Sequence, residues 1–245
     1  MQKRLGSKPK VKYSYGEYNK SDDKEQWIRL TEGCPRDCPY CYEPQEIKVF
    51  DIPEIVRSKV KIIDMNMFVP KKKPLEILRS LPIKNNGTGI IHYQFFCGFD
   101  YRFLNKEIAE EMKKHHFEKL RIAWDWTLKD QYKIKDALKI LYSAGFKTKD
   151  IIIFMICNWD ISYDVCMKKM DLCKVWNVKI ADCYYDNQIE ILTKEFIPIG
   201  WTTEQAYDFR RRVRIHNQIV NQKIYPEINN IQFKNKLKGL IGVKK

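Results

Sequence analysis

Three cysteines stand close together near the start of the chain, in the segment TEGCPRDCPYCY. Cys34, Cys38 and Cys41 follow C-x3-C-x2-C spacing, and the aromatic Tyr40 precedes the last of them. Three thiols so close in sequence cannot all bond to one another, but together they can hold one metal centre. A [4Fe–4S] cube with only three cysteine ligands keeps one open iron, where a cofactor or substrate can bind. The spacing therefore predicts an iron–sulfur centre with an open position.

A zinc knuckle is the alternative interpretation of the same cysteines. Structural zinc sites take four protein ligands, and no Cys or His follows Cys41 at the spacing of a zinc finger. Nothing elsewhere in the chain repeats C-x2-C, so we expect no second cluster. The remaining thiols among the 8 cysteines are predicted to be free, and Cys166 and Cys173 lie on an apolar helical stripe that predicts burial.

With this motif the chain resembles the radical S-adenosylmethionine superfamily. In that family S-adenosylmethionine chelates the open iron of the cluster through its amino and carboxylate groups. A one-electron reductant such as flavodoxin or ferredoxin reduces the cluster, and cleavage of the sulfonium releases a 5′-deoxyadenosyl radical that abstracts hydrogen from a substrate. The resemblance implies that Cys34, Cys38 and Cys41 hold the cluster and that Tyr40 lies near the adenine.

The elements that must position these residues alternate between strand and helix. Short apolar runs predict strands at 27–30, 60–68, 90–96, 120–126, 151–157 and 178–184. Helical spacing of apolar residues predicts helices between them, at 75–81, 105–117, 134–141 and 166–173. This order indicates a parallel sheet with helical crossovers. The resemblance narrows the fold to an α/β, partial (β/α)6 barrel.

We expect the chain to divide into three parts. Residues 1–25 are predicted to form a flexible basic arm with a short edge strand near 11–15, and residues 26–190 the barrel core. Residues 191–245 are predicted to form a helix and a basic tail that pack on the barrel. A capping box at Thr202 and Gln205 opens that helix, and His216 lies on its apolar face as a core residue.

Polar residues stand where the predicted strands end. Asp64 and Asn66 end the second strand, Asp125 ends the fourth, and Asn158 follows the fifth. The chemistry of parallel α/β folds lies at the carboxyl ends of their strands. The resemblance implies that these four side chains contact S-adenosylmethionine, whereas turn or cap roles are the alternative for each.

Three residues follow the third predicted strand. Cys97 is a candidate donor of a hydrogen atom to a substrate radical, a role that the resembled superfamily gives to some cysteines; the alternative is a small apolar residue at the end of a buried strand. Asp100 and Arg102 are candidate substrate contacts, and a mutual ion pair is their alternative.

The formal net charge is +14, and the sequence pI is near 9.3. This charge favours a polyanionic partner such as RNA, with lysine-rich surface as the alternative. Arg210, Arg211 and Arg214 lie on the polar side of the predicted C-terminal helix and form the candidate phosphate-binding patch.

The composition also limits location and function. The sequence contains no run of about 18 apolar residues, so we expect no membrane span. The first residues lack a signal-peptide pattern. We therefore expect a cytoplasmic protein with no membrane partner. Three functions remain open: a radical S-adenosylmethionine enzyme that modifies RNA, one that acts on a small metabolite or nucleotide precursor, and a non-catalytic metal-binding nucleic-acid module.

Overall fold

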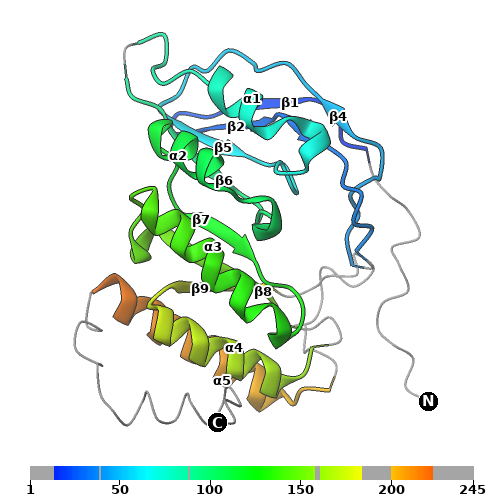
Figure 1. The fold of residues 1–245 in the computed structure, drawn as a ribbon, viewed down its shortest axis with the longest axis vertical. Helices are drawn as coiled ribbons and strands as arrows, with labels where there is room; N and C mark the ends of the chain where they lie inside the picture. Colours follow the sequence, from blue (N-terminus) through cyan, green and yellow to red (C-terminus); the bar gives the residue numbers. More distant parts are fainter. Residues whose placement is uncertain (1–13, 39, 88, 158–160, 184–199, 223–245) are drawn as a thin grey trace.

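The computed structural model describes residues 14–38, 40–87, 89–157, 161–183 and 200–222. Within them the chain alternates between strands and helices, and the helices gather on one side of the strands (Figure 1). Asn158, most of the predicted arm and the predicted basic tail lie outside the described residues. No helix among the described ranges is long and apolar enough to cross a membrane.

Parallel strands form the centre of the molecule and belong to two sheets. The first sheet has the order β1-β2-β5-β6, and the second has the order β7-β8-β9. β1 pairs antiparallel with β2, and the other pairs in both sheets are parallel. The strands are β1 Tyr18–Ser21, β2 Gln26–Arg29, β5 Lys59–Ile62, β6 His92–Phe95, β7 Leu120–Ala123, β8 Ile151–Ile156 and β9 Lys179–Cys183.

Helices form most of the crossovers between the parallel strands, whereas the described part of the connection from β2 to β5 carries two short strands and no helix. A two-stranded ribbon, β3 Thr31–Glu32 with β4 Lys48–Val49, stands beside the first sheet. The 3-10 turns are η1 Pro70–Lys72, η2 Tyr101–Phe103, η3 Leu128–Asp130 and η4 Thr148–Asp150. The helices are α1 Pro74–Ser80, α2 Lys106–Lys114, α3 Gln131–Ser143, α4 Tyr163–Trp176 and α5 Thr203–Asn221.

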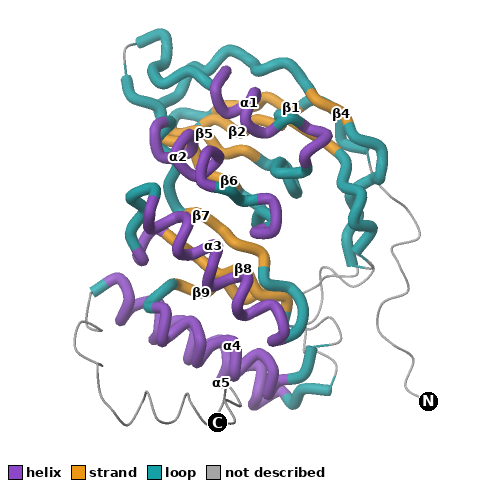
Figure 2. Tube along the Cα trace, viewed as in Figure 1, coloured by secondary structure: helices purple, strands orange, loops and turns teal. Residues whose placement is uncertain are grey.

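The two sheets meet where β6 lies beside β7 (Figure 2). Only isolated parallel bridges join them, at Tyr93 with Phe117 and at Phe99 with Ile122. Between these bridges the guanidinium of Arg121 donates to the carbonyl oxygens of Phe95 and Phe96, at 2.5 and 2.9 Å. The mixed α/β fold with parallel strands is therefore confirmed, and the described strands do not close into a barrel.

The strands bury only one of their two faces. In β8 buried and half-buried residues alternate, although a continuous apolar run such as 151–157 is typical of a parallel strand that is buried on both faces. The buried side chains, such as Ile153 and Met155, share one core with helix residues such as Met112 and Leu138. The opposite face of β8 carries Phe154 and Ile156, which line an open cavity, and this explains their partial exposure.

Several predicted strands end earlier in the structure. The second strand was expected to reach Phe68, but β5 ends at Ile62 because the chain turns inward at Asp64. An edge strand forms at Tyr18–Ser21, so this part of the predicted arm belongs to the sheet. Most of the segment 11–15, where an edge strand was expected, lies outside the described residues.

Helix α5 covers the free edge of β9. The side-chain amide of Asn217 donates to the Ile180 carbonyl at 2.7 Å and accepts from the Ile180 N–H at 2.8 Å. This contact satisfies the N–H and C=O groups of Ile180 in an edge strand. Unpaired groups of this kind can form hydrogen bonds with a strand of another chain. The predicted capping box at Thr202 and Gln205 is confirmed, as is the buried position of His216, whose Nε2 lies 2.7 Å from the Val178 carbonyl oxygen.

Candidate functional site

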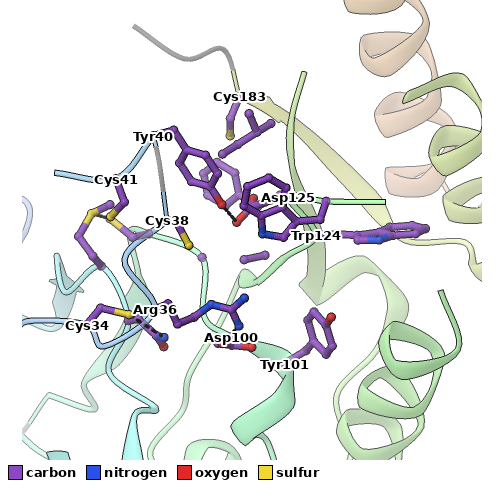
Figure 3. Close-up of a pocket in the computed structure, with 18 of the residues that line it drawn as sticks. Cys34, Arg36, Cys38, Tyr40, Cys41, Asp100, Tyr101, Trp124, Asp125 and Cys183 are labelled. Atoms are coloured by element: carbon purple, nitrogen blue, oxygen red, sulfur yellow. Dashed lines mark hydrogen bonds and ion pairs between the residues drawn. The ribbon is translucent and has the colours of Figure 1, made fainter. Parts of the chain in front are cut away.

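A cavity of about 330 Å³ lies at the carboxyl ends of the parallel strands (Figure 3). Its volume is at the lower end of the range for small-molecule sites. All three motif cysteines line it, so the structure brings the predicted cluster ligands to the rim where the strands end. Sequence-predicted site residues that share this cavity are Cys34, Cys38, Cys41, Tyr40, Asn66, Cys97, Asp100, Arg102 and Asp125.

The cysteine loop folds back tightly on the segment that follows it. Gly33 has a φ of +90°, and a Cβ atom there would lie 1.9 Å from the backbone oxygen of Glu46. The Gly33 N–H donates to the buried carboxylate of Glu43 at 2.7 Å, and the Cys34 N–H donates to the Pro44 carbonyl at 2.8 Å. Only glycine fits this turn, which delivers Cys34 to the cavity.

Asp64 lies behind this rim and does not line the cavity. Its carboxylate accepts hydrogen bonds from the Leu30 N–H at 2.9 Å and from the Thr31 hydroxyl at 2.5 Å. The residue is 3% exposed, and burial raises the pKa of its carboxyl to about 6. Through these two hydrogen bonds Asp64 fixes the chain between β2 and the cysteine loop, and its expected contact with S-adenosylmethionine stays a prediction.

Asn66 does face the cavity, beside the first cysteine. Its Nδ2 lies 3.8 Å from the Cys34 sulfur, and Lys72 donates to its backbone oxygen at 2.8 Å. The side-chain Oδ1 is buried and has no hydrogen-bond partner among the described residues. A buried acceptor without a donor is costly, so this atom is suited to a ligand that brings an N–H group.

Tyr40 joins the cysteine loop to the end of β7. Its hydroxyl donates to Asp125 at 2.9 Å, and its ring packs 5.4 Å from the ring of Trp126 (Figure 3). Burial raises the pKa of the Asp125 carboxyl, and the hydrogen bond from Tyr40 opposes that shift. Because the two residues are 85 positions apart, this contact ties the loop to the second sheet.

Asp100 is the centre of an ion-pair cluster. Arg36 approaches its Oδ2 at 2.8 Å, and Arg102 donates to both carboxylate oxygens, at 2.7 and 2.9 Å. Burial raises the pKa of the Asp100 carboxyl to about 6, and the guanidinium of Arg36 opposes this. The predicted pair of Asp100 and Arg102 is confirmed, and sequence reasoning missed Arg36, which lies between two cluster cysteines.

Two further thiols face the same cavity. The Cys97 sulfur lies 3.8 Å from the Ile63 carbonyl oxygen and 3.5 Å from the Met65 sulfur, and burial raises its pKa to about 12. Cys183, the last residue of β9, also lines the cavity and was not predicted as a site residue. Its place at the end of the sixth predicted strand was the available signal.

Two buried lysines donate hydrogen bonds to backbone carbonyls of residues that line the cavity. Lys169 of α4 is fully buried and donates to the Trp124 carbonyl at 2.8 Å, next to Asp125. Lys72 is likewise fully buried under Asn66. Sequence reasoning missed both, because a lysine on a helix, or in a run of lysines such as 71–73, is usually exposed to solvent.

The arginines of α5 do not line the cavity. Arg211 and Arg214 are exposed and Arg210 is half-buried, as a helix face requires. Asp208 binds Arg211 at 3.2 Å and Arg212 at 2.5 Å, so part of the local positive charge is compensated.

The donor set fits a cluster with one open iron. The loop supplies three thiols and no fourth ligand, and burial raises the pKa of Cys41 to about 11, so a metal must displace its proton. Among the described residues no three Cys, His, Asp or Glu side chains converge as ligands of a single ion. The three thiols that hold a [4Fe–4S] cluster need not converge on one ion, because each thiol binds a different iron. The unpartnered Oδ1 of Asn66 adds an acceptor next to them.

No protein-family model matches this chain, and no curated protein is significantly similar to it in sequence.

Proposed function

We propose that this chain is a radical S-adenosylmethionine enzyme that uses a [4Fe–4S] cluster. The observation that supports this most is the C-x3-C-x2-C loop, whose three thiols line a cavity at the carboxyl ends of parallel strands. We also infer that the strands β2, β5, β6, β7, β8 and β9 make a partial (β/α)6 barrel, with α5 at its open edge. A one-electron reductant such as flavodoxin or ferredoxin is the partner this function requires.

In this proposal each cavity residue has a physical task. Cys34, Cys38 and Cys41 hold the cluster, and the Oδ1 of Asn66 accepts from the amino group of S-adenosylmethionine. The bound cofactor supplies a radical that removes a hydrogen atom from the substrate. Tyr40 and Asp125 keep the loop closed over the cavity through their 2.9 Å hydrogen bond, which limits the entry of water.

Cys97 is proposed as the hydrogen-atom donor. Its thiol faces the cavity that the cluster cysteines line. At neutral pH the thiol keeps its hydrogen because its pKa is raised to about 12. The residue is therefore in the state that a hydrogen-atom donor needs.

Iron content tests the cluster. Protein reconstituted without oxygen should bind about four irons, and Cys34→Ala, Cys38→Ala and Cys41→Ala should each lose that capacity. Cys173→Ala is the matched control, because this thiol is fully buried in the core and should leave the iron content unchanged. Tight zinc binding without iron–sulfur absorption would instead support a metal-binding nucleic-acid module.

RNA and a small metabolite or nucleotide precursor are the two candidate substrates. The net charge of +14 and the exposed Arg211 and Arg214 favour RNA, whereas the volume of the cavity favours a small molecule. If RNA is the partner, affinity should fall steeply with salt as counterions are released, and replacing Arg210, Arg211 and Arg214 together should flatten the slope. Binding that is absent or independent of salt would select the small molecule.

A further inference from the structure

The amino ends of the same strands surround a second cavity, also of about 330 Å³. It lies at the opposite end of the strands from the cysteine loop, and Phe96 lines both cavities. Lys59 begins β5 and His92 begins β6, and the two are register partners. The lining residues are Glu25, Lys59, Val60, Lys61, His92, Gln94, Phe96, Glu118, Lys119 and Arg121.

Two carboxylates line this cavity, against four Lys and Arg side chains. Glu25 forms an ion pair with Lys61, and Glu118 lies 2.6 Å from the Nδ1 of His92. Lys59 and Lys119 are exposed at the mouth and have no carboxylate partner among the described residues. Lys179, at the start of β9, adds a positive charge close to Lys119. Burial lowers the pKa of Lys179, Asp150 opposes that shift, and the charge of Lys119 lowers the pKa further.

Arg121 brings an uncompensated charge into the cavity. Its guanidinium is bonded to the carbonyl oxygens of Phe95 and Phe96 and lies 5.5 and 5.9 Å from the rings of Phe96 and Phe154. The side-chain oxygen of Gln94 also accepts from this guanidinium, at 2.8 and 3.0 Å. These partners are neutral, and no carboxylate among the described residues pairs with Arg121. Burial lowers the pKa of Arg121, because a partly buried cation without a counter-charge is disfavoured.

We propose that this second cavity binds the phosphate group of a small phosphorylated molecule between Arg121, Lys59 and Lys119. A phosphate monoester carries about −1.5 to −2 charges at neutral pH, which matches three unpaired cations better than a carboxylate does. Because its Nη1 donors are held by the Phe95 and Phe96 carbonyls, Arg121 contributes mainly its positive charge, and the two lysines add point charges that can reach the phosphate oxygens. A cavity of about 330 Å³ suits a small ligand better than a strand of RNA. This site does not depend on the cluster or on the proposed function.

Inorganic phosphate is the probe for this site. The thermal midpoint of the full chain should rise with phosphate concentration more than with sodium chloride of equal ionic strength, because a ligand of the folded state stabilises it. In Lys59→Gln/Lys119→Gln the apparent affinity should fall by at least about tenfold. Both lysines are exposed, so this variant should fold even if Arg121→Gln does not.

The matched control removes the same charge elsewhere. Lys106 and Lys139 are exposed residues of α2 and α3 with their own carboxylate partners, so Lys106→Gln/Lys139→Gln should keep the full response to phosphate. An equal response of both double variants would assign the effect to general stabilisation by phosphate and overturn the proposal. Equal stabilisation by acetate would overturn the choice of phosphate. Binding of an oligoribonucleotide through Lys59 and Lys119, without any response to phosphate, would overturn the small ligand.

Discussion

The two ends of the parallel strands differ in how their charged groups are compensated. At the carboxyl end each buried carboxylate is held by neighbours: Asp64 by Leu30 and Thr31, Asp100 by arginines, and Asp125 by Tyr40. At the amino end two carboxylates face four Lys and Arg side chains, and Lys59, Lys119 and Arg121 have no carboxylate partner among the described residues. The first end is therefore organised to fix a loop in place, and the second to attract an anion.

Gly33→Ala should have the largest effect on the carboxyl end. The added Cβ would meet the Glu46 oxygen at 1.9 Å, so the cysteine loop must move, and we expect a loss of about 3 kcal/mol or more in unfolding free energy. Chemical denaturation measures that loss, and the reconstituted variant should also hold little iron.

Gly200→Ala is the control for backbone strain. Gly200 also has a positive φ, of +75°, but no atom of the described residues lies within 4 Å of an added Cβ. Gly200→Ala should lose only the unfolding free energy that the left-handed backbone conformation costs, and its iron content should stay unchanged. If both variants lose the same stability and keep their iron, the close packing of the loop on Glu46 is unimportant.

Asp64→Asn should change how stability depends on pH. The folded-state pKa of about 6 lies above the value of 3.8 that an unperturbed aspartic acid has. The protonated carboxyl therefore stabilises the folded wild type below about pH 4. This stabilisation, up to about 3 kcal/mol, is lost as the pH rises through 6.

The variant does not titrate at this position. The difference in unfolding free energy, wild type minus Asp64→Asn, should therefore fall between pH 4 and pH 7 in urea denaturation series. A difference that stays constant or rises with pH would mean that the ionised Asp64 is well stabilised by the Leu30 and Thr31 donors.

Lys119→Gln should have the smallest effect on the iron centre. The residue is exposed at the amino end and does not line the cysteine cavity. The iron content should equal that of the wild type, and the unfolding free energy should stay within about 0.5 kcal/mol of it. The response to phosphate should weaken. A loss of iron in this variant would show that the two ends are coupled through the residues around Phe96.

The sequence predicted most of the elements but not all of their bounds. Apolar runs such as 151–157 and 178–184 identify β8 and β9 because burial against the helices selects those residues. Strand ends depend on contacts from distant residues. The end of β5 follows from Asp64, whose partners Leu30 and Thr31 are more than 30 positions away.

The candidate site was predictable where its signal is local. The cysteine spacing is read within eight residues, and Asn66, Cys97 and Asp125 were found from their places at strand ends. Lys169 and Arg36 could not be found in this way. Their roles depend on Trp124 and Asp100, which only the fold brings near.

Reductive cleavage of S-adenosylmethionine tests the central proposal most directly. The cluster-loaded chain, given a strong one-electron reductant and S-adenosylmethionine, should form 5′-deoxyadenosine, quantified by chromatography. Cys38→Ala should form none, while the core variant Cys173→Ala should keep this activity per folded molecule. A wild-type chain that carries a complete iron–sulfur cluster and still yields no 5′-deoxyadenosine would contradict the proposed function.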